Sequence, residues 1–193
     1  MNCKTFGLAI ALASLALGAD RAAAYDFEDS NPWNNSQPLA AATPQQSAIP
    51  RETVAYDGRY APGTIFVSTT ERRLYLILPD HQALKYGIGV GRPGFTWAGV
   101  KTISRKAEWP GWTPPATMLR RRPDLPRHMA GGIDNPLGAR AMYLGSSIYR
   151  IHGSNEPDTI GEAVSSGCIR MTNEDVQDLY ERVKVGTKVV VSR

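Results

Sequence analysis

Two residues in the C-terminal third of the chain have the types and the spacing needed for nucleophilic chemistry. Cys168 lies in the run Ser165-Ser166-Gly167-Cys168-Ile169-Arg170, sixteen residues after His152. A cysteine attacks a carbonyl carbon as its thiolate, and a histidine is the usual partner that takes the thiol proton. The spacing is compatible with a Cys/His dyad. The alternative is an inert, buried thiol that packs as a small hydrophobe.

The neighbours of Cys168 offer groups that such a reaction uses. Gly167 lets the backbone approach a substrate closely, and the amides of Gly167 and Cys168 could face a developing oxyanion. Arg170 could favour the thiolate or bind a substrate carboxylate, or it could form an ordinary ion pair that fixes the loop. Ser165 and Ser166 place hydroxyls beside the nucleophile, although serines before a glycine are common turn residues.

Of the three histidines in the chain, His152 is the best placed to act as a base. It follows an apolar strand-like segment and precedes Gly153, so its imidazole would lie at the rim of a sheet beside a permissive backbone. His81 and His128 fall in a turn and in a loop, where polar residues need no special role.

The N-terminus has the pattern of a secretory signal. Lys4 precedes an apolar stretch over residues 6–18, and three alanines at 22–24 form a small-residue cleavage site. The apolar stretch is too short for a membrane-spanning helix, which needs about twenty residues. We therefore predict a signal peptide over residues 1–24, no membrane span and export to the periplasm.

Removal of this signal would leave Cys168 as the only cysteine, since the other one is Cys3. That excludes an intrachain disulfide, and a thiolate metal site would have a single cysteine to use. No metal is predicted. A lone thiol in an oxidising compartment is a chemical liability, which favours a use for Cys168.

The charge of the chain is mildly basic, with a net charge of +4 at pH 7 for the full sequence and +3 without residues 1–24. The one dense cluster, Arg120-Arg121-Arg122, is followed by Pro123-Asp124 and lacks the interleaved aromatic residues of a nucleic-acid surface. We interpret it as a solvated loop that could keep an acidic polymer nearby, and we predict no nucleic-acid partner.

The composition changes near residue 55. Residues 25–55 are rich in Asn, Gln, Pro, Ser and Ala and lack apolar periodicity, which predicts a flexible linker. Residues 56–193 are enough for one compact domain with a single core. No internal repeat is visible.

Short β-branched and aromatic runs predict a mainly β domain with one or two helices. The expected strands are residues 64–68, 74–78, 83–90, 100–104, 141–144, 147–151 and 187–191. Thr172 is followed by acidic residues, as at a helix N-terminus. An apolar stripe at i, i+3, i+4 and i+7 comes next, formed by Val176, Leu179, Tyr180 and Val183. Cys168 then lies in the loop that leads into this helix.

A Pro/Gly-rich stretch over residues 108–138 is too punctuated for regular structure. Long irregular insertions of this kind are often binding loops or lids. Trp97, Trp109 and Trp112 lie in or near it, where they could line a substrate groove or anchor the loops.

The segment His152-Gly153-Ser154-Asn155-Glu156-Pro157, followed by Ile160-Gly161 and by the run from Ser165 to Met171, resembles the active-site signature of the L,D-transpeptidase catalytic domain, the YkuD family. Residues 135–144 and 186–191 extend the resemblance, which covers roughly residues 60–192. It departs from the family at Ser166, where histidine is often found.

The resemblance implies a β-sandwich-like L,D-transpeptidase catalytic domain over residues 56–193. It implies that Cys168 is the nucleophile, that His152 is the general base, and that the carbonyl of Gly153 orients the imidazole. It requires no metal or organic cofactor. The residues expected around the oxyanion and the substrate are Gly167, Ser165, Ser166 and Arg170.

The substrates that the resemblance implies are peptidoglycan stem peptides. Cys168 would attack the carbonyl of the third residue of a stem tetrapeptide, release D-Ala, and pass the acyl group to an amine. That amine could belong to another stem, which gives a 3→3 cross-link, or to an outer-membrane protein. Water as acceptor would instead make an L,D-carboxypeptidase or a hydrolase of wall links, and a non-catalytic wall-binding module is a third reading.

Overall fold

The computed structural model describes residues 49–193. The predicted signal peptide (1–24) and most of the predicted linker (25–55) lie outside the described residues. Among the helices between residues 49 and 193, none is long and apolar enough to cross a membrane.

The first half of the main sheet is a meander that the C-terminal strand completes. Its strands are β1 (Glu52–Ala55), β2 (Ile65–Ser68), β3 (Arg73–Leu78), β4 (Gln82–Gly87) and β11 (Lys188–Ser192). The strands β2, β3 and β4 pair antiparallel because short turns join them. In contrast, β11 comes from the far end of the chain and pairs with β2 in parallel. The two ends of the domain are thereby joined in one sheet.

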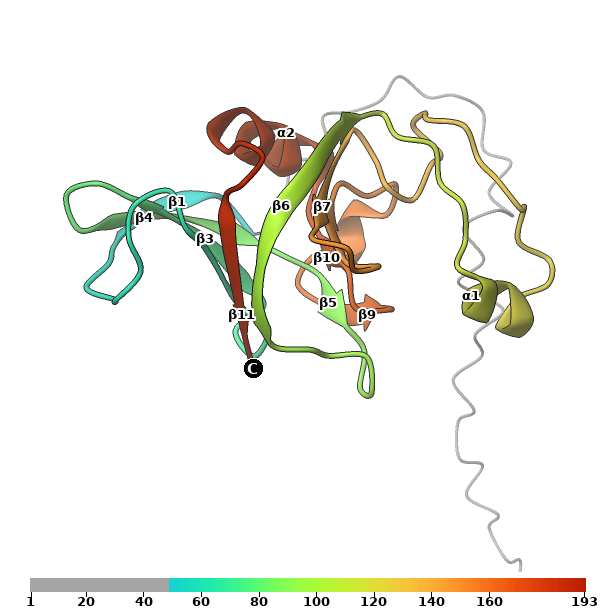
Figure 1. Cartoon of the computed structure of the whole chain (residues 1–193), viewed down its shortest axis with the longest axis horizontal. Helices are drawn as coiled ribbons and strands as arrows, with labels where there is room; N and C mark the ends of the chain where they lie inside the picture. Colours follow the sequence, from blue (N-terminus) through green and yellow to red (C-terminus); the bar gives the residue numbers. More distant parts are fainter. Residues whose placement is uncertain (1–48) are drawn as a thin grey trace, which may run out of the picture. The chain divides into compact units, whose positions relative to one another are not determined.

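A long strand, β6 (Gly99–Glu108), connects this half to the half that carries the candidate site. Its first residues pair with β11, and its later residues pair with β7 (Arg140–Leu144). The register shifts between Ile103 and Arg105, and a bulge of this kind bends a strand. Figure 1 shows the curved path of β6. The predicted sandwich-like arrangement is therefore one sheet that curls at β6.

Short strands complete the structure around the predicted active-site loop. β8 (Arg150–His152) pairs antiparallel with β7, and β10 (Ile169–Arg170) pairs in parallel with β8. The nine strands follow the order β1-β4-β3-β2-β11-β6-β7-β8-β10. A separate two-stranded sheet joins β5 (Val90–Gly91) to β9 (Ala163–Ser165).

The C-terminal helix α2 (Asn173–Arg182) begins where the sequence predicts. The Thr172 hydroxyl accepts a hydrogen bond from the amide of Asp175 at 3.2 Å, which caps the first turn. Val176 and Leu179 are buried against the sheet. Full burial of such side chains contributes roughly 1.5–3 kcal/mol each, so the apolar stripe holds α2 in place more than its intrinsic propensity does.

The apolar core lies between the curled sheet and α2. The fully buried side chains include Ile65, Leu74, Tyr86, Met142, Ile151, Met171 and Leu179. Ile151 and Met171 belong to the segments that carry His152 and Cys168, so the core anchors the backbone on which both candidate residues stand. The buried Tyr86 donates its hydroxyl proton to Asp178 of α2 at 2.6 Å, which ties the helix to β4.

The structure confirms a mainly β fold with two helices and differs from the sequence prediction in two places. Residues Glu52–Ala55, inside the predicted linker, form β1 and pair with β4. Three of the four residues of β1 are exposed, so this edge strand leaves no apolar pattern in the sequence. The stretch 108–138, expected to be irregular, contains the short helix α1 (Ala116–Arg121), which buries none of its residues.

Candidate active site

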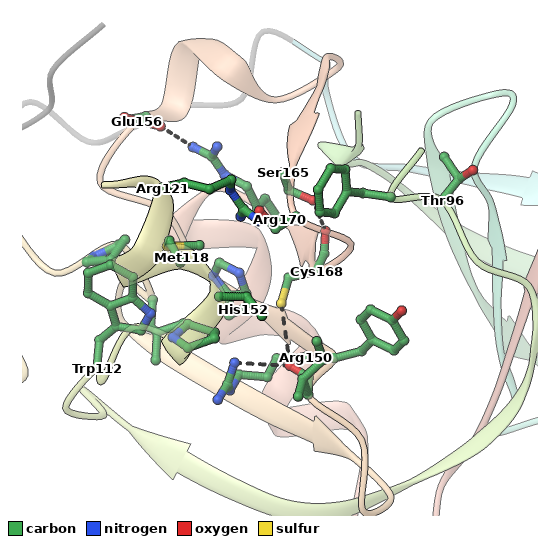
Figure 2. Close-up of a pocket in the computed structure, with 18 of the residues that line it drawn as sticks. Thr96, Trp112, Met118, Arg121, Arg150, His152, Glu156, Ser165, Cys168 and Arg170 are labelled. Atoms are coloured by element: carbon green, nitrogen blue, oxygen red, sulfur yellow. Dashed lines mark hydrogen bonds and ion pairs between the residues drawn. The ribbon is translucent and has the colours of Figure 1, made fainter. Parts of the chain in front are cut away.

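The strand pair β8–β10 brings the two candidate catalytic residues into one pocket. In this parallel pair His152 lies opposite Arg170, and Cys168 directly precedes β10, at the level of Arg150. Side chains two positions apart on a strand point to the same side, so Cys168, Arg150 and His152 face one space. That space is a cavity of about 290 Å³ (Figure 2), called the pocket below.

The imidazole of His152 is buried and uncharged. The residue is only 5% exposed, and its Nδ1 lies 2.6 Å from the carbonyl oxygen of Gly153. Because a carbonyl only accepts, Nδ1 carries the proton and Nε2 keeps its lone pair. Burial, followed by the positive charge of Arg170, lowers the pKa of His152 to about 3, against the opposing effect of the Gly153 carbonyl. The imidazole is therefore uncharged at neutral pH.

Cys168 is held as a neutral thiol. Its side chain is half-buried in the pocket wall, with Sγ 3.9 Å from the carbonyl oxygen of Ile148, a distance at which a thiol donates weakly. Burial raises the pKa of Cys168, while the charges of Arg150 and Arg170 act in the opposite direction. Both shifts favour the neutral forms, a thiol and an uncharged imidazole, in the protein without substrate.

The loop before Cys168 is shaped by Ser165 and Gly167. The Ser165 hydroxyl donates to the carbonyl of Cys168 at 2.7 Å and accepts from the amide of Gly167 at 3.1 Å. Gly167 has a φ of 105°, and a Cβ there would lie 2.6 Å from the ring of Tyr149. Of the two expected oxyanion donors, the Gly167 amide is thus already engaged. Within residues 49–193 the Cys168 amide makes no hydrogen bond. Ser166 lines the pocket.

Arg170 fixes the loop that follows His152. Its Nη2 donates to the hydroxyls of Ser154 at 2.9 Å and Thr159 at 2.7 Å, and it forms an ion pair with Glu156 at 2.5 Å. These contacts favour the ion-pair alternative over a role in binding a substrate carboxylate. The charge of Arg170 still acts on both His152 and Cys168.

Arg150 is a site residue that the sequence interpretation missed. Its Nη1 donates to the Ile148 carbonyl at 3.1 Å, and Cys168 points its thiol at the same oxygen. The Nε of Arg150 is buried and has no hydrogen-bond partner within the described part of the chain. The sequence could have identified Arg150, because alternate residues of a strand point to the same side and Arg150 lies two positions before His152.

The three tryptophans have different positions. Trp97 donates from Nε1 to the Gly167 carbonyl at 2.8 Å and stacks on Tyr149 at 4.5 Å between ring centroids, so it supports the Cys168 loop. Trp112 lines the pocket and is 8% exposed. Trp109 is 42% exposed and does not line it.

Within the arginine cluster 120–122, Arg120 and Arg121 are exposed to solvent, as the sequence predicts, but they end the helix α1 and do not form a loop. Arg121 lines the pocket. Arg122 forms an ion pair with Asp124 at 2.6 Å. Met118 of the same helix also faces the pocket (Figure 2), so the insertion supplies one wall of it. No group of three or more His, Cys, Asp or Glu side chains in residues 49–193 is arranged to bind a metal ion.

Residues 62–191 match the YkuD family model, described as the L,D-transpeptidase catalytic domain. The chain belongs to this family. The YkuD match contains the whole pocket and the strands from β2 onward except for the last residue of β11, and it leaves out β1.

Curated relatives of this YkuD domain are named in the same terms. The "Probable L,D-transpeptidase ErfK/SrfK" of Escherichia coli (strain K12) is 40% identical over 136 residues, which cover 66% of this chain and 43% of the relative. The "Probable L,D-transpeptidase YcfS" of the same strain is 38% identical over 152 residues, covering 73% of this chain and 47% of the relative. The chain therefore spans less than half the length of these two relatives.

Solved structures share the YkuD fold. L,D-transpeptidase 3 from Mycobacterium tuberculosis superposes with a TM-score of 0.56 at 18% identity, over 67% of this chain and 60% of that one. A Brucella melitensis protein, named a probable carnitine operon oxidoreductase, is 45% identical with a TM-score of 0.52, over 76% of this chain and 96% of its own. The first likeness supports the fold alone, and the second protein is named for a different activity.

Proposed function

We propose that this protein is a peptidoglycan L,D-transpeptidase in which Cys168 is the nucleophile and His152 the general base. The observation that carries the proposal is the pairing of a thiol and a neutral imidazole in one pocket, with Nδ1 of His152 bound to the Gly153 carbonyl. Such a base takes a proton only when the thiol attacks, so charge develops in the transition state and not before it. Membership of the YkuD family supports the same chemistry.

The first half-reaction is acylation. The Cys168 thiol loses its proton to Nε2 of His152 as Sγ attacks the carbonyl of the third residue of a stem tetrapeptide. The carbonyl oxygen becomes an oxyanion, and the unengaged amide of Cys168 is the donor placed to stabilise it. The C–N bond to D-Ala then breaks, and the His152 imidazolium returns its proton to the leaving amine. The product is a thioester on Cys168.

The second half-reaction transfers the acyl group to an amine. An incoming amine loses a proton to His152 as it attacks the thioester, and the Cys168 sulfur leaves and is reprotonated. The amine of another stem peptide gives a 3→3 cross-link, and an amine of an outer-membrane protein attaches that protein to the wall. Neither half-reaction draws on a metal or an organic cofactor. The predicted signal peptide over residues 1–24 supports a periplasmic location.

A hydrolase and a non-catalytic wall-binding module are the competing functions. Water as acceptor uses the same dyad and yields a tripeptide, whereas a binding module has no use for an oriented base beside the thiol. The buried and oriented state of His152 favours an enzyme over the binding module.

The experiment is to incubate the full chain with a disaccharide tetrapeptide that contains diaminopimelate and to resolve the products by mass spectrometry. Cross-linked dimers that disappear with Cys168→Ala are the expected result. Tripeptide alone would show a carboxypeptidase. The reaction is also run with an added protein that supplies an amine acceptor. A substrate that stays unchanged in both reactions would count against acyl transfer. The Cys168→Ala variant should keep the melting temperature within a few degrees, because a half-buried side chain loses only its sulfur.

A further inference from the structure

The pocket carries more positive than negative charge. The charged side chains that line it are Arg121, Arg150, Arg170 and Glu156, and the imidazole of His152 is neutral. Arg170 is paired with Glu156, so two guanidinium groups are left without a carboxylate among the described residues. A cavity lined by one sign of charge concentrates ligands of the opposite sign. The pocket is therefore built for an anionic ligand.

Arg150 and Arg121 differ in the contacts that their guanidinium groups make within the protein. Arg150 donates to the Ile148 carbonyl and stacks on Tyr143, with 5.1 Å between its guanidinium carbon and the ring centroid. Arg121 makes no hydrogen bond or ion pair with any residue in the range 49–193. Its contact is with the ring of Phe95, 5.5 Å from guanidinium carbon to ring centroid. Among the arginines that line the pocket, Arg121 is thus the one whose guanidinium N–H groups have no acceptor among the described residues.

A second arginine lies on the same ring. The guanidinium carbon of Arg92 is 4.2 Å from the Phe95 centroid, and this group likewise has no carboxylate partner among the described residues. Burial and the charge of Arg121 both lower the pKa of Arg92. Two like charges that share one phenyl ring repel each other, and an anion between or beside them would relieve that repulsion. The ring holds the pair in place through cation–π contacts.

The two arginines approach from separate segments. Arg92 and Phe95 belong to the loop between β5 and β6, whereas Arg121 ends α1, and Figure 2 shows the Arg121 side chain extending from α1 into the pocket. A ligand held by Arg121 would therefore lie between the insertion and the Cys168 side of the pocket. Because a guanidinium binds a carboxylate through two parallel hydrogen bonds, the contact would also orient the ligand.

We propose that Arg121, with Arg92 on the same Phe95 ring, forms a carboxylate-binding subsite that orients the acyl donor beside Cys168. The proposal rests on the proposed function, because it takes a stem peptide as the ligand. It moves the carboxylate contact from Arg170, where the sequence suggested it, to a residue of the insertion. The carboxylate is that of the third residue's side chain or the terminal one of the leaving D-Ala.

The test measures peptide binding in the Cys168→Ala background of the full chain, so that turnover is not needed. The probes are a diaminopimelate-containing stem tetrapeptide and two variants of it, one amidated at the side-chain carboxylate of diaminopimelate and one at the C-terminus. The protein variants are Arg121→Gln and, as the matched control, Arg120→Gln, which removes the same charge from the same helix outside the pocket. Calorimetry or fluorescence gives Kd for each pair.

We expect Arg121→Gln to weaken binding of the unmodified peptide about tenfold, as for the loss of a charge-assisted hydrogen bond. Arg120→Gln should change Kd less than twofold. One of the amidated peptides should bind equally to Arg121→Gln and to the parent, and the position of its amide identifies the carboxylate. Arg92→Gln should weaken binding in the same direction, by a smaller factor.

Equal losses in Arg121→Gln and Arg120→Gln would overturn the subsite, since that result indicates general attraction between a basic surface and an anionic peptide. So would a tenfold loss that persists with both amidated peptides. In either case, formation of cross-links by the unsubstituted chain would leave the proposed function standing. If the unsubstituted chain makes no product and the Cys168→Ala protein binds none of the peptides, the proposed function fails and the subsite fails with it.

Discussion

His152 and Arg170 are register partners in the parallel pair β8–β10, and the backbone amide of Met171 donates to the His152 carbonyl at 2.9 Å. Strand pairing therefore holds His152, the proposed base, and the strand that directly follows Cys168, the proposed nucleophile. A displacement of one strand would move the imidazole relative to the Cys168 sulfur. Reactions that depend on proton transfer tolerate such displacements poorly.

The pKa of His152 predicts the acid side of the pH–rate profile. Because the imidazole stays neutral down to a pH near 3, its capacity as a base should persist well below pH 6.5. We expect kcat/KM for acylation, measured between pH 4.5 and 7.5, to show no inflection near pH 6.5. An acid limb with an apparent pKa between 6 and 7 would contradict the neutral, buried state of His152.

The same group should make stability depend on pH. The folded-state pKa of His152, about 3, lies below its ordinary value of 6.5, so between these values the unfolded chain binds a proton that the folded protein does not. The free energy of unfolding should therefore fall as pH decreases through this window, by at most about 1.4 kcal/mol per pH unit from this residue. Denaturant titrations at pH 7.5 and 5 should show a smaller decrease for His152→Asn. Equal decreases in both proteins would assign the effect to other groups.

Arg150 should set the reactivity of the Cys168 thiol. Its guanidinium lowers the pKa of Cys168 against the effect of burial, so Arg150→Gln should raise that pKa and slow alkylation at pH 8. We expect the alkylation profile, followed with iodoacetamide, to move to higher pH, with partial recovery in Arg150→Lys.

The matched control for Arg150 is Arg105→Gln. Arg105 also lies over the Tyr143 ring, with 3.7 Å from its guanidinium carbon to the centroid, and it does not line the pocket. Its loss removes the same kind of ring contact without changing the charge beside Cys168. If the two variants shift the alkylation profile equally, Arg150 acts through packing and not through its charge.

Ser165 should position the nucleophile loop. Ser165→Ala removes the acceptor of the Gly167 amide and the donor to the Cys168 carbonyl, and it leaves both backbone groups without those partners. We expect a loss of about 1–3 kcal/mol in the free energy of unfolding and a decrease in kcat larger than any change in KM. Ser166→Ala serves as the stability control because the structure gives the Ser166 hydroxyl no hydrogen bond within residues 49–193. Unfolding in urea should show a loss of stability for Ser165→Ala and little change for Ser166→Ala.

Several features follow from the residues near each other in sequence. The capping residue Thr172 and the apolar stripe after it predict α2, and short β-branched runs predict most strands, because these signals depend on local periodicity. The edge strand β1 could not be predicted from local periodicity, since its side chains are mostly exposed and only its pairing with β4 makes it a strand. The helix α1 could not be predicted for a similar reason, because none of its residues is buried and no apolar stripe marks it.

The candidate site divides in the same way. Residue types and spacing make a Cys168/His152 dyad plausible, and the resemblance to the YkuD family is what selects these two residues and adds Gly153. Only the tertiary structure contains the electrostatics of the candidate pair, since burial raises the pKa of Cys168 and lowers that of His152, and two arginines act on both. The tertiary structure also determines which arginine can bind a ligand. Arg170 is paired with Glu156, fourteen residues away in the chain, whereas Arg121 reaches the pocket from the insertion 108–138 and has no such partner among the described residues. Charge and burial depend on which segments meet in space, and a linear pattern does not contain that information.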